Sequence, residues 1–182
     1  RYTDSDKTIF NGISKVPPGN YFLINKNKVT RKTYWSLEKD SSDIKDIQSY
    51  LDQYQEKLET SITSHLISDV PIGSFLSGGL DSSIVTAIAT KELDNQMSTY
   101  TIGFNSSNSE HLFARSTSHY LKTKHIEQII DDVDMGLLEK VMWHLEEPIN
   151  DPAVVPTFLL SKLASESSKV VLTGEGSDEV NA

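Results

Sequence analysis

The chain has 182 residues, a formal net charge of −9 and a hydrophobic content of 37%. This length suits one domain or slightly more, and the composition predicts a globular, cytoplasmic protein. The absence of cysteine excludes a disulfide framework, a cysteine-based zinc site and a cysteine nucleophile within this chain. The acidic balance without a basic patch argues against nucleic acid as a partner, and the apolar runs are too short to span a membrane.

Residues 1–38 have the pattern of a small antiparallel sheet. Strand-like pieces at 21–24 and 29–30 flank the polar turn Asn25-Lys26-Asn27-Lys28. About three dozen residues cannot bury a sheet core alone. We therefore expect this segment either to pack on the following domain or to stay partly unsupported.

A polar linker at residues 38–43 precedes a long amphipathic helix. Apolar residues recur at steps of three or four from Ile44 to Leu66, and Ser42 or Asp43 is expected to cap the helix. Tyr50 and Tyr54 are expected at the edge of the core. The two tryptophans, Trp35 and Trp143, are expected within it.

From residue 70 onward, strands and helices alternate. Strands are predicted at 72–76, 99–104, 125–130 and 169–172, and helices at 82–93, 110–121, 135–145 and near 156–165. Such repeats indicate an α/β fold, a parallel sheet with helices on both faces. Ligands in these sheets bind beyond the carboxyl ends of the strands. The loops after Leu76 and Leu172 should therefore converge, although nearly a hundred residues separate them.

The first of these loops, Ser77-Gly78-Gly79-Leu80-Asp81-Ser82-Ser83, is typical of a phosphate-binding turn. Two glycines let the backbone approach an anion, and N–H groups at the start of the next helix donate to its oxygens. Asp81 would repel bare phosphate, which makes sense if Mg²⁺ lies between them. A simple helix cap is the alternative interpretation. The common Gly-x-x-x-x-Gly-Lys-Ser/Thr loop is absent.

Four ordered motifs between residues 70 and 180 resemble glutamine-hydrolysing asparagine synthetases of the PP-loop ATP pyrophosphatase superfamily. They are the Ser-Gly-Gly-Leu-Asp-Ser loop, residues 100–104 followed by Thr123-Lys124-His125-Ile126-Glu127, the Glu147-Pro148…Asp151-Pro152 segment, and Gly174-Glu175-Gly176-Ser177-Asp178-Glu179. The resemblance implies a PP-loop (adenine nucleotide alpha hydrolase-like) fold. It also implies that residues 1–38 are the C-terminal remnant of an Ntn-type glutaminase domain. Residues 39–182 would be a synthetase ATP-binding domain, truncated at its C-terminal end.

This resemblance implies amidation of aspartate to asparagine with ATP, through β-aspartyl-AMP, with nitrogen from glutamine or ammonia and release of AMP and pyrophosphate. Asp81 and Asp178 would ligate Mg²⁺, and Glu175 would be catalytic, forming the adenylate and handling the proton of the incoming ammonia. The residues implied to contact ATP are Leu76, Ser77, Gly78, Gly79, Asp81, Ser82, Ser83, Ile102, Gly103, Thr173 and Gly174.

Several alternatives stay open. The chain can instead belong to a related amidotransferase that acts on another carboxylate, or be a non-catalytic nucleotide-binding remnant. Glu175 can also belong to a solvated acidic turn, and Glu147 and Asp151 either arrange the substrate or end a helix. Small-molecule substrates are the expected partners, and a homo-oligomer is left open. We expect the chain alone to bind MgATP weakly and to make no asparagine.

Overall fold

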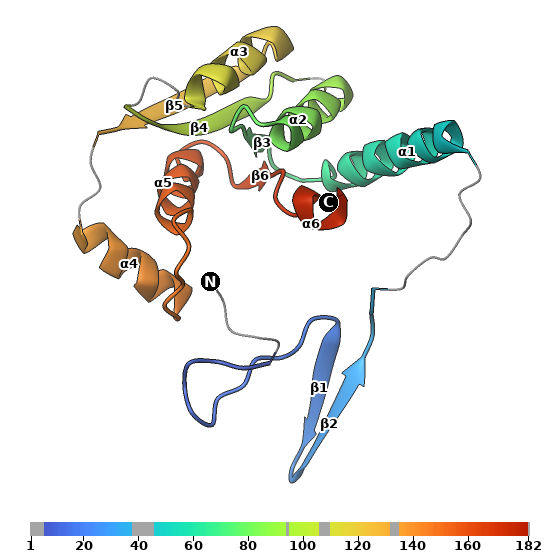
Figure 1. Cartoon of the computed structure of the whole chain (residues 1–182), viewed down its shortest axis with the longest axis vertical. Helices are drawn as coiled ribbons and strands as arrows, with labels where there is room; N and C mark the ends of the chain where they lie inside the picture. The colour runs from blue at the N-terminus through green and yellow to red at the C-terminus, as the bar shows by residue number, and fades with distance from the viewer. Residues whose placement is uncertain (1–5, 38–45, 94, 106–109, 132–134, 182) are drawn as a thin grey trace.

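The computed structural model describes residues 6–37, 46–93, 95–105, 110–131 and 135–181. Within them lie a two-stranded hairpin and a separate four-stranded sheet (Figure 1). The hairpin pairs β1 (Asn20–Asn25) with β2 (Lys28–Thr33) in antiparallel register, and Lys26 turns the chain with a φ of 44°. The predicted antiparallel pair at the N-terminal end is therefore confirmed.

The apolar side chains of the hairpin region are exposed to solvent. Ile24 is 75% exposed and Val29 is 63% exposed, so this small sheet does not bury a core. Trp35 is 58% exposed, and its expected place in the core is wrong. Lys15 Nζ lies 2.7 Å from Glu147 Oε2, an ion pair that joins this segment to the following domain. The segment is thus attached by a polar contact and remains largely unsupported by packing.

The larger sheet is parallel and has the strand order β5-β4-β3-β6. Its strands are β3 (Ile72–Phe75), β4 (Ser98–Phe104), β5 (Lys124–Ile130) and β6 (Val170–Leu172). In chain order β3 is the first strand of this sheet; it pairs with the last, β6, and Ile72 lies opposite Val170. The loops that follow these two strands therefore leave from the same edge of the sheet, as the strand–helix pattern predicted.

Helices cover both faces of this sheet (Figure 1). The helices α2 (Leu80–Glu92) and α3 (His111–Leu121) pack on one face, and α5 (Val154–Ser165) packs on β4 from the other. The helix α4 (Met135–Leu145) lies against α5, and the short α6 (Ser177–Asn181) follows β6. The α/β fold class is confirmed, whereas α6 was not predicted.

The long helix α1 (Ile47–His65) packs on α2 through its C-terminal half. Asp46 caps it by accepting hydrogen bonds from Gln48 N at 3.3 Å and Ser49 N at 3.1 Å. The cap expected at residues 42–43 is therefore wrong, and those two residues lie outside the described part. Towards the helix start, Ile47 is 76% exposed and Tyr50 is 46% exposed. The apolar stripe thus reaches the core at Ile62, near the end of the helix that lies opposite the Asp46 cap.

The core lies between α1, α2 and the sheet. Ile62, Ile72, Ala89 and Met97 form its buried cluster. Trp143 on α4 lies outside it with 81% of its surface exposed, so the second tryptophan was also wrongly predicted. Among the described residues, no helix is both long enough and apolar enough to cross a bilayer.

Candidate functional site

A cavity of about 680 Å³ opens at the carboxyl edge of the parallel sheet. The ends of β3 and β4 form its floor, and the loops after β3 and β6 contribute its polar side. Residues of α5 form the facing wall. The cavity lies where parallel α/β sheets bind ligands, at the ends of adjacent strands.

Most of the residues predicted to form the site line this cavity. They are Leu76, Ser77, Asp81, Ser82, Ile102, Thr173, Gly174, Glu175 and Asp178. The remaining predicted residues are not among those that line the cavity. They are Gly78, Gly79, Ser83 and Gly103.

The loop between β3 and α2 is braced by its own hydroxyl groups. The Ser82 side chain accepts a hydrogen bond from Ser77 N at 3.2 Å, and Ser83 Oγ donates to Gly79 O at 2.7 Å. Gly79 is the N-cap residue of α2, and no side chain in the described part caps the helix there. The first amides of α2 are therefore left for another acceptor, which is the arrangement that binds anions.

Gly78 fits this loop against α3 instead of facing the cavity. Its φ of 83° lies in the left-handed region that favours glycine. A Cβ at this position would lie 2.6 Å from Ala114 N and 2.9 Å from Glu110 O, which are backbone atoms at the start of α3. The shape of the loop therefore depends on where the first turn of α3 lies.

The loop after β6 touches the start of α2 through Gly174. A Cβ on Gly174 would lie 2.7 Å from Ser82 N and 3.0 Å from the carbonyl carbon of Asp81. Ser177 Oγ donates to Gly174 O at 2.9 Å and closes the turn into α6. This close approach brings Asp81, Glu175 and Asp178 to the same cavity.

The carboxylates suit a metal that arrives with its own oxygen ligands. No group of three or more His, Cys, Asp or Glu side chains forms a metal site in the described ranges. Mg²⁺ in nucleotide sites takes one or two protein carboxylates, with phosphate oxygens and water completing its shell. Asp81 in the first turn of α2 and Asp178 in α6 line the same cavity and fit that requirement.

The wall opposite the two loops has no direct signal in the sequence. Pro156, Thr157 and Leu160 on α5 line the cavity, as do Ala153 just before that helix and Glu110 before α3. A helix pattern predicts that α5 exists, but not which face of the sheet it covers. That these residues line the cavity can be inferred only once the strand order of the sheet is known.

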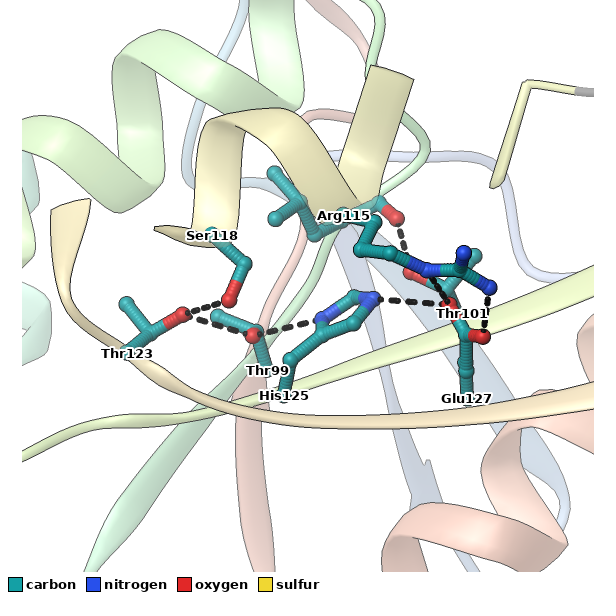
Figure 2. A network of polar contacts seen from close by, with 8 residues as sticks. Thr99, Thr101, Arg115, Ser118, Thr123, His125 and Glu127 are labelled. Carbon is teal, nitrogen blue, oxygen red and sulfur yellow. Dashed lines mark hydrogen bonds and ion pairs between the residues drawn. The ribbon is translucent and has the colours of Figure 1, made fainter. Parts of the chain in front are cut away.

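A chain of polar contacts links α3 to β4 and β5 beside this site (Figure 2). Thr99 Oγ1 on β4 lies 3.0 Å from His125 Nδ1 on β5, and His125 Nε2 lies 3.5 Å from Glu127 Oε2. Arg115 on α3 donates through Nε to Glu127 Oε2 at 3.2 Å, and its Nη2 contacts Oε1 of the same carboxylate. We call these four residues the Thr99–Arg115 network.

The network shifts the pKa values of two of its members. The hydrogen bond from Arg115 lowers the pKa of Glu127, which stabilises the carboxylate. Burial lowers the pKa of His125, although the nearby Glu127 carboxylate opposes that shift. The folded protein therefore favours a neutral His125 beside an ionised Glu127.

This arrangement predicts acid sensitivity. Unfolded His125 takes up a proton near pH 6.5 before folded His125 does, so the free energy of unfolding should fall as the pH drops below 6.5. Below pH 4.5, the ordinary pKa of Glu127, the free energy of unfolding should fall further. The reason is that Arg115, His111 and His125 favour the charged form of Glu127 in the folded protein. Urea unfolding measured from about pH 8 to pH 5 tests the first part.

We expect His125→Asn to flatten the stability curve below pH 6.5. Asparagine can still hydrogen-bond to Thr99 but takes up no proton. His119→Asn, on the exposed side of α3, is the matched control and should keep the wild-type slope. An unchanged slope in His125→Asn would contradict the prediction.

The fold and the cavity define an α/β protein with a cavity bordered by two loops at the carboxyl ends of adjacent parallel strands. Residues 53–182 match the asparagine synthase family. The chain belongs to that family.

Two sequence relatives agree with this assignment. The glutamine-hydrolyzing asparagine synthetase 1 of Bacillus subtilis is 33% identical over 187 residues, which cover 99% of this chain and 29% of that protein. A putative glutamine-hydrolyzing asparagine synthetase of Mycobacterium tuberculosis is 36% identical over 135 residues, 73% of this chain and 21% of that protein. The chain spans less than a third of the length of these two asparagine synthetases.

Among solved structures, an NH3-dependent NAD synthetase from Campylobacter jejuni has a TM-score of 0.47 at 16% identity, over 71% of this chain and 58% of that one.

Proposed function

We propose that this chain is the ATP-binding part of an asparagine synthetase. The observation that carries the proposal is the contact of Gly174 with Asp81 and Ser82, which joins an uncapped helix start to an acidic loop around one cavity. A helix N-terminus supplies N–H donors to phosphate, and the carboxylates supply metal ligands. The names of the relatives, glutamine-hydrolyzing asparagine synthetases, favour aspartate as the acceptor.

The proposed reaction has two steps. An oxygen of the aspartate β-carboxylate attacks the α-phosphorus of ATP, and the bond to pyrophosphate breaks to leave β-aspartyl-AMP. Ammonia, released from glutamine, then attacks the acyl carbon, and AMP leaves as asparagine forms. Catalysis of the first step rests on positioning and on stabilising the charge of the leaving pyrophosphate.

The residues of this chain take defined roles in that scheme. The amides that begin α2 and the Ser77 hydroxyl bind the phosphates, with Gly78, Gly79, Ser82 and Ser83 holding the loop. Leu76, Ile102 and Gly103 border the nucleoside on one side, and Thr173 and Gly174 contact the ATP from the opposite loop. Glu175 lines the cavity and accepts the proton of the incoming ammonia.

Mg²⁺ would be held by Asp81 and Asp178. When bound, it would neutralise charge on the phosphates, which the negative cavity otherwise repels. Asp81, Glu175, Asp178 and Glu179 all line that cavity, so a phosphate chain without a cation meets several carboxylates there.

We also propose that residues 1–38 are the end of a glutaminase domain and that residues 39–182 are the synthetase part. The exposed apolar side chains of the hairpin, such as Ile24 and Val29, support this division because they resemble one side of a larger sheet. The asparagine synthase family match begins at residue 53, after this segment.

Two measurements test the function. Calorimetric titration of the chain with MgATP should show one binding event per chain. Exchange of labelled pyrophosphate into ATP should then require aspartate, because adenylation of the carboxylate is reversible. Exchange with a different carboxylic acid would favour an amidotransferase with another substrate. Binding without any exchange would favour a nucleotide-binding remnant, and no binding at all would contradict the proposal.

A further inference from the structure

The loop at residues 77–83, called here the phosphate loop, packs on α3. The proposed reaction gives α3 no catalytic role. Gly78 packs on the first turn of α3, where added atoms would meet Ala114 N at 2.6 Å and Glu110 O at 2.9 Å. Glu110 itself lines the cavity. A small shift of α3 would therefore change both the loop and the cavity beside it.

Polar side chains one turn apart fix α3 on the sheet. Ser118 Oγ lies 2.7 Å from Thr123 Oγ1, and Thr123 Oγ1 lies 2.9 Å from Thr99 Oγ1 on β4. Three residues earlier on the helix, Arg115 binds Glu127 of β5 through two nitrogen atoms. A two-point contact with a carboxylate constrains orientation as well as distance, because the guanidinium fork is rigid.

The network continues inwards from this ion pair. Glu127 Oε2 accepts from Arg115 and lies 3.5 Å from His125 Nε2, a buried atom that makes no hydrogen bond within the described residues. On the neighbouring strand, Thr101 donates to the carbonyl of Leu76, the residue that follows β3 and leads into the loop. In the sheet register Thr101 is paired with Glu127 and Thr99 with His125. Two elements that carry the network thus also contact the loop or its base, α3 at Gly78 and β4 through Thr101 at Leu76.

We infer that Arg115 and Glu127 are positioning residues for the phosphate loop: their contact holds α3 against β5, and α3 in turn holds Gly78 and the loop in the shape that binds pyrophosphate. This inference rests on the proposed function for its ligand, but its structural part can be tested without one. It assigns a specific task to a residue pair that lies outside the cavity lining.

The test compares Arg115→Gln and Glu127→Gln with the wild-type full chain. We expect backbone amide exchange in residues 77–83 to quicken by on the order of tenfold, while the core strands keep their protection. Lys91→Gln, which removes the same charge from the exposed end of α2, is the matched control and should leave exchange in the loop unchanged. Arg115→Lys keeps the charge but loses the fork, so it should have an intermediate effect and remain usable if the glutamine variants fail to fold.

Ligand titrations separate positioning from general destabilisation. MgATP and magnesium pyrophosphate should each bind about tenfold more weakly to the network variants, whereas AMP affinity should change less than about twofold. Equal losses for AMP and ATP, or a uniform rise in exchange over the whole chain, would overturn the inference. So would unchanged loop exchange in a folded variant. A wild-type chain that binds neither ATP nor pyrophosphate would contradict the proposed function, while the exchange experiment still decides whether the loop depends on the network.

Discussion

Replacing Asp81 by asparagine should change the affinity for ATP in opposite directions with and without Mg²⁺. With Mg²⁺ present, binding should weaken at least about tenfold, because even outer-shell partners of a metal cost about 10- to 100-fold when removed. With EDTA present, ATP should bind about fivefold more tightly, since about 1 kcal/mol of repulsion between the Asp81 carboxylate and phosphate is relieved. Calorimetric titration under the two conditions measures both changes.

The controls for this experiment are available in the same chain. Asp69→Asn removes an equal charge from an exposed position outside the cavity and should leave both affinities unchanged. Asp178→Asn should behave as Asp81→Asn does, because both carboxylates line the same cavity. If Asp81→Asn weakens binding equally in Mg²⁺ and in EDTA, the carboxylate shapes the loop and does not ligate a metal.

Gly174→Ala should separate the two loops and destabilise the protein. The new Cβ would meet Ser82 N at 2.7 Å and the carbonyl carbon of Asp81 at 3.0 Å, and these backbone atoms cannot turn away as a side chain would. Overpacking of this kind costs about 1–3 kcal/mol of stability. We expect that loss in urea unfolding, together with at least about tenfold weaker MgATP binding at a temperature where the variant remains folded.

Gly79→Ala provides the comparison for stability. Gly79 has a φ of −70°, which any residue adopts, and its added Cβ would meet only the movable Ser77 hydroxyl at 3.2 Å. We therefore expect a stability loss below about 1 kcal/mol. Equal losses of stability in the two variants would show that the backbone around Gly174 can move to accommodate a Cβ, which would contradict the tight contact described above.

The strand and helix pattern was predictable because each element carries its own local signal. The period of the apolar residues and the glycine turns placed β3, α2 and β4 within one or two residues of their observed bounds. The same reasoning predicted that the loops after Leu76 and Leu172 converge, since parallel strands end at one edge. The pairing of β3 with β6 itself has no local signal, because many strand orders satisfy the same pattern.

The parts of the site that depend on tertiary packing were missed. Nothing in the pattern of α5 shows that Pro156 and Leu160 face the cavity rather than solvent. The ion pair of Arg115 with Glu127 joins an exposed helix position to a strand position, and charged residues on helices are usually solvated. Trp143 was wrongly placed in the core because size and apolarity alone do not determine burial.

The strand order also fixes when the site can exist during synthesis of the chain. The strand β3 emerges early, but its partner β6 begins at Val170, after four helices and two further strands have been made. Contacts between residues so far apart in sequence form slowly, because a long loop must close first. Until then the glycine loop lacks the Gly174 contact, and one edge of β3 stays open to other strands. A growing chain therefore has the glycine loop long before it has the complete cavity, and translation must pass Val170 before the two sides of the cavity can meet.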